Sequence, residues 1–328
     1  MPRLKETPED FLVEELPLYA PSGAGEHTWV EVEKRLRTTD EVAAELAAAA
    51  GTDSDRVGWA GRKDREAVAR QWLSVPGVPP ERAAGFAGEG WRVLRAAAHH
   101  ERLRMGELTG NRFHLRVRDV DDGAAAAAAT RLAELARHGL PNHFGDQRFG
   151  QDGGNPERGA RLLRGEAVQG GRRQRGLYLS ALQSALFNEV LRARPAPPHV
   201  ILPGDLALVH ASGALLVAGS PVFPAGAWVE RAARFEVSPT GPLVGHKMRV
   251  PRGEALARER AAAERLGVPW VHELPHLRGH LLSGGRRPLR VAVAEASATH
   301  AADTLELTFV LPPGSYATVL VAELFSTA

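Results

Sequence analysis

Two segments alternate hydrophobic and polar residues, which is the spacing of half-buried β-strands. The first is residues 26–33 (EHTWVEVE) and the second is residues 112–118 (RFHLRVR). In the second, Phe113, Leu115 and Val117 share one face, and three arginines and a histidine share the other. Because side chains alternate across a strand, this period of two predicts a strand at each place.

Other segments carry helix signals. Thr38 and Glu41 form a capping box before an alanine-rich run, and Gly51 follows that run. The box satisfies free N–H groups at a helix start, and glycine is typical of a helix end. Periodicity and breakers predict further helices over residues 64–72, 124–137, 181–194 (capped by Ser180) and 254–266.

The amino-acid composition of the chain changes after residue 150. Residues 151–176 are rich in Gly and Arg, which predicts loop and short helix, and residues 196–245 predict small strands between Gly and Pro. Residues 289–300 and 304–324 return to a strand-like pattern. This order predicts an α+β fold in which a second unit interrupts a sheet domain.

Composition excludes several classes of protein. The 328 residues include no Cys, so disulfides, Cys-ligated metals and a thiol nucleophile are excluded. No apolar run reaches the roughly 18–20 residues of a membrane span, and the N-terminus lacks a secretory apolar core. We therefore expect a cytoplasmic protein that does not enter a membrane.

The charge is nearly balanced, but its basic part is unusual. The net charge is +2, and all but four of the 41 basic residues are arginines. Arginine binds phosphate in a two-pronged geometry, which suits nucleic acid. Coding bias toward Arg and Ala explains the same excess, so arginine content alone decides nothing.

Asp64 stands in the segment GRKDREAVARQ with Arg62, Lys63 and Arg65 beside it. One interpretation is structural, because Asp is a preferred residue at a helix start. The other is a carboxylate nucleophile or base that nearby cations keep ionised. The pattern alone leaves both open.

Two further segments have a structural and a functional interpretation. The polar face of residues 112–118 suits either solvent or a phosphate backbone, and Asn111 before it can donate and accept at a base edge. In the loop 141–150 (PNHFGDQRFG), Phe144 and Phe149 suit either the core or base stacking.

The segment HELPH matches the zinc motif H-E-x-x-H with His272, Glu273 and His276. That motif needs a continuous helix so that both histidines share a face. Pro275 breaks such a helix, and we therefore predict no metal here, with His280 excluded as a third ligand for the same reason.

Six segments, in order, resemble the TruD family of tRNA pseudouridine synthases and span both ends of the chain. Those that contain Lys63 and Asp64, and the loop ending QRFG, are specific to the family. The segments are TPEDFLVEE (7–15), AGRKDREAVARQW (60–72), LTGNRFHL (108–115), LPNHFGDQRFG (140–150), LSALQSALFNEVL (179–191) and LPPGSYATVLVAEL (311–324).

The resemblance implies a fold and an activity. It implies a pseudouridine synthase-type, mainly antiparallel mixed sheet with helices packed on it, formed by residues 1–150 and 291–328. An inserted α/β TRUD domain would span residues 151–290. It implies isomerisation of uridine to pseudouridine, at position 13 of tRNA, without a cofactor or a metal. Separately from the resemblance, we expect a monomer with no obligate protein partner, although the sequence does not reveal whether the protein dimerises.

The resemblance also assigns residues. Asp64 matches the catalytic aspartate, and Lys5 lies where a basic residue pairs with it. Phe11 matches an aromatic residue of the uracil pocket. Four more residues match substrate-binding positions, namely Lys63, Asn111, Phe113 and Tyr316. Gln183 departs from the family, which often has a basic residue there.

Flipping a base out of RNA costs a few kcal/mol, and stacking on an aromatic side chain recovers about 1–3 kcal/mol. Asp64 would attack C1′ or ring C6, or assist cleavage through a glycal-like intermediate; the sequence leaves the three routes open. We expect the RNA backbone to lie in a basic cleft between sheet domain and insert, contacted by Arg62, Arg65, Arg116, Arg148, Arg172, Arg173 and Arg175.

Two other classes of function compete with this one. The first is an RNA-binding protein without catalysis, which the retention of Asp64 disfavours. The second is a zinc hydrolase built on His272 and His276, which a metal assay on the purified protein decides.

Overall fold

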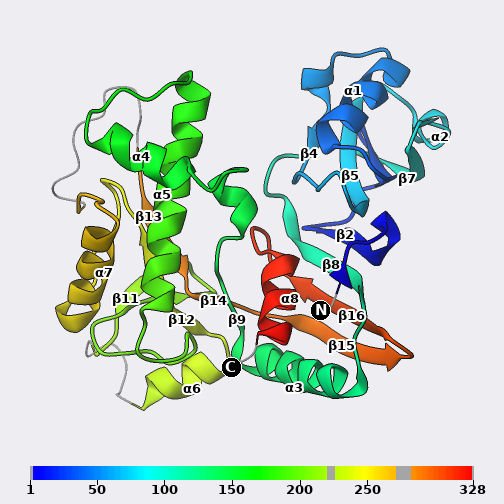
Figure 1. Ribbon diagram of the computed structural model, residues 1–328. Coiled ribbons are helices and arrows are strands. Elements are labelled where there is room, and N and C mark those ends of the chain that lie inside the picture. The colour runs from blue at the N-terminus through cyan, green and yellow to red at the C-terminus, as the bar shows by residue number, and fades with distance from the viewer. Residues whose placement is uncertain (1–2, 220–225, 271–281, 327–328) are drawn as a thin grey trace. The chain divides into compact units, whose positions relative to one another are not determined.

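The computed structural model describes residues 3–219, 226–270 and 282–326, and the chain divides into two compact units (Figure 1). The first unit comprises Met1–Ala133, Val293–Ala317 and Glu323–Ala328, and the second comprises Glu134–Ala292 and Thr318–Ala322. This division into compact units does not test the domain limits that we predicted after residues 150 and 290, and those limits stay a prediction.

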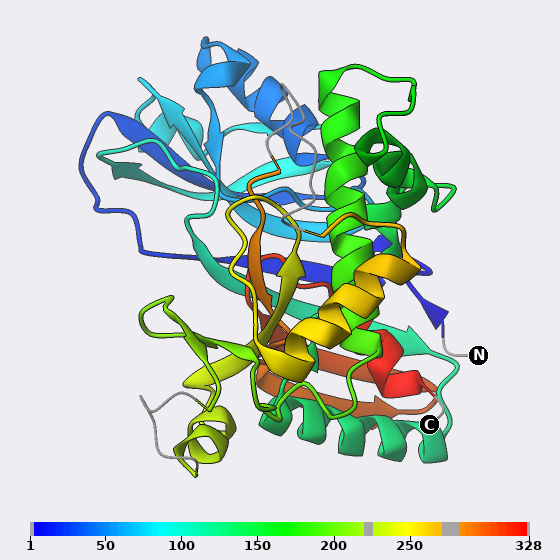
Figure 2. The ribbon, with the colours of Figure 1, turned by 90° about the vertical axis from the view of Figure 1, so that its left-hand side faces the viewer.

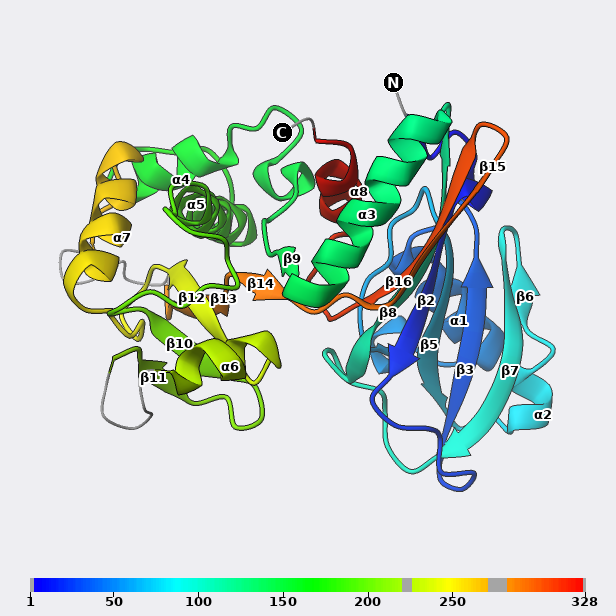
Figure 3. The ribbon, with the colours of Figure 1, turned by 90° about the horizontal axis from the view of Figure 1, so that it is seen from below.

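A ten-stranded sheet forms the framework of the first unit. Its main order is β15-β16-β8-β2-β5-β3-β7-β6, with β1 paired to β8 and β4 paired to β5, and Figure 3 shows the strands side by side. Only β2 and β5 run parallel among the described strands of this sheet. The strands are β1 (Arg3–Leu4), β2 (Phe11–Pro17), β3 (His27–Lys34), β4 (Gly58–Trp59), β5 (Val68–Pro76), β6 (Ala87–Gly88), β7 (Trp91–His99), β8 (Leu108–Arg118), β15 (Ala294–Ala301) and β16 (Thr304–Leu311).

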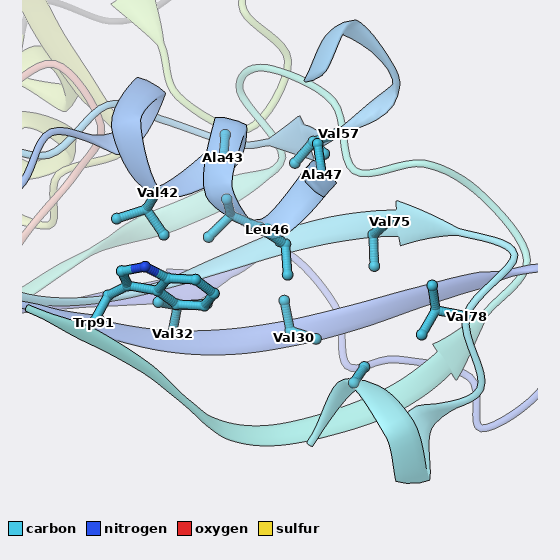
Figure 4. Packing of buried hydrophobic residues seen from close by; sticks show 12 residues of the cluster. Val30, Val32, Val42, Ala43, Leu46, Ala47, Val57, Val75, Val78 and Trp91 are labelled. Atoms are coloured by element: carbon cyan, nitrogen blue, oxygen red, sulfur yellow. The ribbon is translucent and has the colours of Figure 1, made fainter. Parts of the chain in front are cut away.

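Helix α1 (Thr39–Ala50) covers one face of this sheet. Thr38 and Glu41 form the predicted capping box, and Gly51 ends the helix in the left-handed conformation at φ 71°. Figure 4 shows Leu46 of α1 directed toward Val30 on β3, and Val42 of α1 directed toward Val32 and Trp91. These side chains are almost completely buried, so the apolar stripe of α1 fixes the helix on the sheet.

The other helical segments of the first unit are short or lie at its ends. They are α2 (Pro80–Ala83) and the 3₁₀ turns η1 (Pro8–Asp10) and η2 (Ser54–Arg56). Helices α3 (Asp122–His138) and α8 (Ala317–Phe325) each belong partly to both units. The prediction of a helix over residues 124–137 is confirmed.

Long helix α5 organises the second unit. Figure 2 shows α5 in green with α7 in gold beside it, and Leu182 and Leu186 of α5 share an apolar core with Ala262 of α7. The helices are α4 (Asn155–Leu163), α5 (Arg172–Arg192), α6 (Ala227–Ala233) and α7 (Gly253–Arg265), with the 3₁₀ turn η3 (Asp146–Phe149).

The second unit also holds two small sheets. One has the order β11-β10-β12-β13 and the other pairs β14 with β9. Their strands are β9 (Leu140–Pro141), β10 (Leu206–Val209), β11 (Leu215–Val217), β12 (Val237–Leu243), β13 (Gly285–Pro288) and β14 (Arg290–Val291). With the sheet of the first unit, they confirm the α+β class.

Three local predictions are wrong. Residues 64–67 form a turn and β5 follows at Val68, so there is no helix over 64–72. β5 pairs with β2 on one side and β3 on the other, and these ladders override local helix propensity. Asp64 is therefore not a helix cap.

The other two errors concern helix limits. Helix α5 begins at Arg172 rather than after Ser180, whose hydroxyl donates to the carbonyl of Leu177 inside the helix. The segment after Tyr316 is helix α8, not strand. Its buried residues Ala317, Leu320 and Leu324 recur every three to four positions, which is helical spacing.

Candidate active site

Asp64 stands in the loop between β4 and β5, with its carboxylate half exposed. The side chain keeps 51% of its accessible surface. The loop itself is tightly held, because the Lys63 N–H donates to the Thr39 hydroxyl oxygen at 3.0 Å and the Lys34 ammonium donates to the Asp64 carbonyl at 2.7 Å. An accessible carboxylate on a fixed backbone is the arrangement that a nucleophile or base requires.

Lys5 connects Asp64 to the aromatic residue Phe11. Its Nζ lies 3.8 Å from Oδ2 of Asp64 and 4.3 Å from the centre of the Phe11 ring. Lys5 has a φ of 63°, a left-handed conformation that a lysine adopts at a cost in backbone energy. The structure thus brings together three residues that the sequence analysis assigned to one site.

Phe11 begins β2 and lies in an aromatic row on one face of the sheet. Its ring meets that of Phe113 edge-on at 6.0 Å, and Phe113 stacks on Phe309 at 5.4 Å. All three rings are buried. Such contacts between rings fix their orientation, so the row forms a rigid apolar wall.

Asn111 lies on the same face, one pleat further along β8 from Phe113. It pairs in register with Glu15 of β2 and Leu311 of β16. Its Oδ1 is buried and has no hydrogen-bond partner within the described part of the chain. A buried acceptor without a donor is costly, and a ligand N–H would satisfy it.

Tyr316 precedes α8 and is half-buried in the first unit. Among the described residues, no hydrogen bond, ion pair or ring contact joins it to Asp64 or Phe11.

Lys63 turns away from Asp64 and forms a buried ion pair. Its Nζ lies 2.5 Å from Oε2 of Glu15, and the side chains of Lys63 and Glu15 are 6% and 0% exposed. The second Glu15 oxygen accepts the N–H of Trp72 at 3.1 Å. The Lys63 ammonium is therefore occupied in holding the loop to Glu15, which lies beside Asn111 on the same face of the sheet.

Three buried polar residues support this loop, and the sequence analysis missed their role. The Thr39 hydroxyl, which accepts from Lys63, donates onward to Oε1 of Gln71 at 2.9 Å. Lys34 is only 1% exposed. The sequence did contain a signal for Lys34, because it follows an alternating strand on the apolar face. A lysine on such a face needs buried hydrogen-bond partners.

Burial sets the charge of Lys34. Desolvation lowers the pKa of its ammonium to about 8, and the Asp64 carboxylate partly opposes this shift. Below that pH Lys34 is an ammonium that donates to the carbonyls of Asp64 and Arg37.

Two of the predicted RNA-backbone arginines flank Asp64 in sequence and are exposed. The Arg62 guanidinium forms two hydrogen bonds to the carboxylate of Asp40, at 3.0 and 3.1 Å. Arg65 lies 3.7 Å from Glu41 and donates to a backbone carbonyl. Exposed pairs of this kind are weak, so both guanidiniums can exchange partners.

Arg116 belongs to a different surface. It alternates with Leu115 and Val117 on β8, so it lies on the sheet face opposite Phe113, and its Nε is 3.1 Å from Glu306. Arg112 on that face likewise pairs with Glu14 and Glu295. The structure does not bring Arg116 together with Phe11 and Asn111.

The other four predicted arginines lie in the second unit. Arg148 donates to the Ser184 hydroxyl at 3.3 Å, and Arg175 donates to two backbone carbonyls ahead of its helix. Arg172 and Arg173 are exposed in the first turn of α5. Phe144 packs edge-on against Phe187 at 5.5 Å. This contact favours the core over base stacking as the role of that loop residue.

No cluster of three or more metal-ligating side chains occurs among residues 3–219, 226–270 and 282–326. The HELPH segment lies outside these ranges, so its histidines are not described. No helix in the described ranges is both long and apolar enough to span a membrane.

Comparisons with known proteins cover nearly the whole chain. A family model described as tRNA pseudouridine synthase D (TruD) matches residues 2–170 and 169–324. A tRNA pseudouridine synthase D of Anaeromyxobacter sp. (strain Fw109-5) is 42% identical, over 98% of this chain and 91% of the relative. Proteins of the same name from Geobacter metallireducens and Thermus thermophilus are 38% and 40% identical, over 98% of this chain and 94% and 87% of theirs.

A solved structure has the same fold. A crystal structure from Methanosarcina mazei, titled as a putative tRNA pseudouridine synthase D (TruD), superposes with a TM-score of 0.82 and covers 99% of this chain and 94% of its own. At 19% identity it bears on the fold alone. With the family model and the relatives above it, the assignment is complete, and this chain belongs to the TruD family of tRNA pseudouridine synthases.

Proposed function

We propose that this protein isomerises uridine to pseudouridine in tRNA, at position 13, with Asp64 as the catalytic carboxylate. Family membership supports the reaction class. The observation that carries the role of Asp64 is its half-exposed carboxylate, 3.8 Å from a lysine that also touches a buried aromatic ring.

The reaction requires few groups from the protein. The C1′–N1 bond breaks, uracil turns, and a C1′–C5 bond forms, while C5 loses its proton and N1, now free of the ribose, gains one. Asp64 attacks C1′ or C6, or assists cleavage through a glycal-like intermediate, and each route begins from an ionised carboxylate. Lys5 supplies the adjacent positive charge.

The target base must first leave the RNA stack. Phe11 and Phe113 offer it an apolar wall, and a uracil that stacks on Phe11 would share that ring with the Lys5 ammonium or displace it. The unpartnered Oδ1 of Asn111 suits the N3–H of uracil, and Tyr316 is assigned to the same pocket from the family motif that it matches. Arg62 and Arg65, with Arg148, Arg172, Arg173 and Arg175, would bind phosphates.

Arg116 is left out of this proposal, because it lies on the other face of the sheet. Lys63 stays in the proposal through Glu15, whose carboxylate it holds beside Asn111 on the face of Phe11. The proposal keeps the expectations of a monomer without cofactor that works in the cytoplasm.

Substitution of Asp64 by Asn tests the catalytic role. Asp64→Asn keeps the size of the side chain and removes its charge, so pseudouridine formation in unmodified tRNA should fall at least ~10³-fold, of the order that loss of a nucleophile produces. Binding of tRNA should change less than about threefold. Pseudouridine mapping with wild type and variant measures both the site and the rate.

Asp40→Asn is the matched control, since Asp40 is an exposed aspartate near the same loop that pairs with Arg62. It should stay within a few-fold of wild type. Full activity of Asp64→Asn removes Asp64 from catalysis, and modification of another position in tRNA removes position 13.

A further inference from the structure

The catalytic loop is fixed at Asp64 itself by Lys34, the last residue of β3. The ammonium of Lys34 donates to the carbonyl of Asp64 at 2.7 Å and to the carbonyl of Arg37 at 2.7 Å. The first acceptor belongs to the loop before β5 and the second to the loop between β3 and α1. One side chain thus joins two loops that are far apart in sequence.

This arrangement is unusual because lysine is rarely buried. Lys34 is 1% exposed, and it lies on the face of the sheet that α1 and the loop of Asp64 cover. Burying an ammonium costs free energy unless hydrogen bonds replace its water shell. Apolar side chains such as Val32 fill the same face two residues earlier, so packing alone does not require a lysine at position 34.

Lys34 does not reach the substrate side of Asp64. Its Nζ bonds to the backbone oxygen, while Lys5 stands at the carboxylate. The two lysines therefore act on different atoms of one aspartate. Lys5 faces the reacting oxygens, and Lys34 fixes the backbone from which the side chain projects.

We propose that Lys34 is a positioning residue for catalysis, which sets the location of the Asp64 carboxylate through the backbone of its loop. This inference rests on the proposed role of Asp64. Without Lys34 the carbonyls of Arg37 and Asp64 lose their common donor, and the loop is released at the residue that carries the chemistry. A displacement of about 1 Å at a reacting group costs on the order of 10²-fold in rate.

Lys34→Met tests the proposal, because methionine retains length and apolar volume but cannot donate. We expect kcat for pseudouridine formation to fall about 100-fold while KM for tRNA changes less than about threefold. Lys34→Arg restores a donor and should recover part of kcat. A merely structural lysine would lower stability and leave kcat of the folded fraction unchanged.

Val32→Ala is the matched control, since Val32 lies on the same strand and face and is completely buried. It should lower the melting temperature without lowering kcat. A Lys34→Met enzyme with wild-type kcat overturns the positioning role, and so does Val32→Ala with the same loss of kcat. If wild type itself makes no pseudouridine, the proposed function fails instead, which keeps the two failures distinct.

The absence of cysteine allows a finer test. Lys34→Cys carries a single thiol, which can be alkylated in denaturant with 2-bromoethylamine to give a lysine isostere, or with 1-bromopropane to give its apolar counterpart. After refolding, the aminoethyl form should regain at least about tenfold more kcat than the propyl form. Equal kcat for the two refolded forms overturns the proposal, and wild type passed through the same treatment measures the yield of refolding.

Discussion

At the scale of single residues, the site depends on which polar groups are buried. The Asp64 carboxylate is half exposed and free to react, whereas Lys63 and Glu15 beside it are buried as a pair. Two neighbours in sequence therefore have opposite roles. Position 64 meets the substrate in our proposal, and position 63 holds the loop to the sheet.

This assignment predicts the effect of breaking the pair. Lys63→Met leaves the Glu15 carboxylate buried without its cation, so we expect the free energy of unfolding to fall by about 3–5 kcal/mol in urea denaturation. The double variant Lys63→Met with Glu15→Gln removes the uncompensated charge and should recover part of that loss. A Lys63→Met protein as stable as wild type would contradict the buried ion pair.

At the scale of elements, strand pairing decides where the catalytic loop begins and ends. Residues 64–72 have a helical pattern, yet β5 forms because β2 and β3 provide partners on both of its edges. The turn at 64–67 is what remains between β4 and β5. The start of α1 contributes to the same region, since Thr39 binds the Lys63 N–H.

The cap of α1 supports a prediction at this scale. The Thr38 hydroxyl accepts the Glu41 N–H at 3.2 Å, and the Glu41 carboxylate accepts the Thr38 N–H at 2.6 Å. Thr38→Ala should cost about 1 kcal/mol of unfolding free energy, and Thr38→Ser should restore most of it. Urea titration at neutral pH measures both, and equal stability of the alanine variant and wild type would exclude a stabilising cap.

The same cap should depend on pH. Its hydrogen bonds, with the backbone N–H of Thr38 the largest contributor, hold the pKa of the Glu41 carboxyl below its usual range. A carboxyl whose pKa is lowered on folding stabilises the protein above its unfolded pKa, and this contribution is lost as the pH falls through the folded one. Thr38→Ala keeps this backbone N–H and removes only the hydroxyl that also donates to Glu41, so the difference in unfolding free energy between wild type and Thr38→Ala should shrink only in part in acid, as urea titration across pH measures.

At the scale of the whole molecule, the location of the charges matters more than the net charge. The net charge is only +2, and many arginines pair with carboxylates across the strands. The sheet face of Arg116 is such a ladder of ion pairs, while Arg62 and Arg65 are exposed near Asp64. Local field, not net charge, would then attract RNA.

This distribution predicts a salt dependence for tRNA binding. Arg62→Ala and Arg65→Ala should each weaken binding and lower the slope of log affinity against log salt by about 0.7–1, as expected for one lost phosphate contact. Arg116→Ala is the matched control and should leave the slope unchanged. Filter binding across a salt series measures all three, and a wild-type affinity insensitive to salt would exclude phosphate contacts altogether.

The amino-acid sequence was enough to predict the strands at 26–33 and 112–118, the capped helix after Thr38, the α+β class and the family. These features depend on local periodicity, on helix caps and on family motifs, and all three signals come from residues that are close in sequence. The sequence analysis also assigned Asp64, Lys5 and Phe11 to one site, because each matches a site position of the family that the chain resembles.

The side chains that support that site were identified only in the folded protein. β5 is a strand because of partners at 11–17 and 27–34, and Lys34 reaches Asp64 because β3 ends beside its loop. Likewise Lys63 pairs with Glu15, and Arg116 lies on the sheet face opposite Phe113. These are long-range pairings, and their energies come from burial and cross-strand contact, which no local pattern specifies.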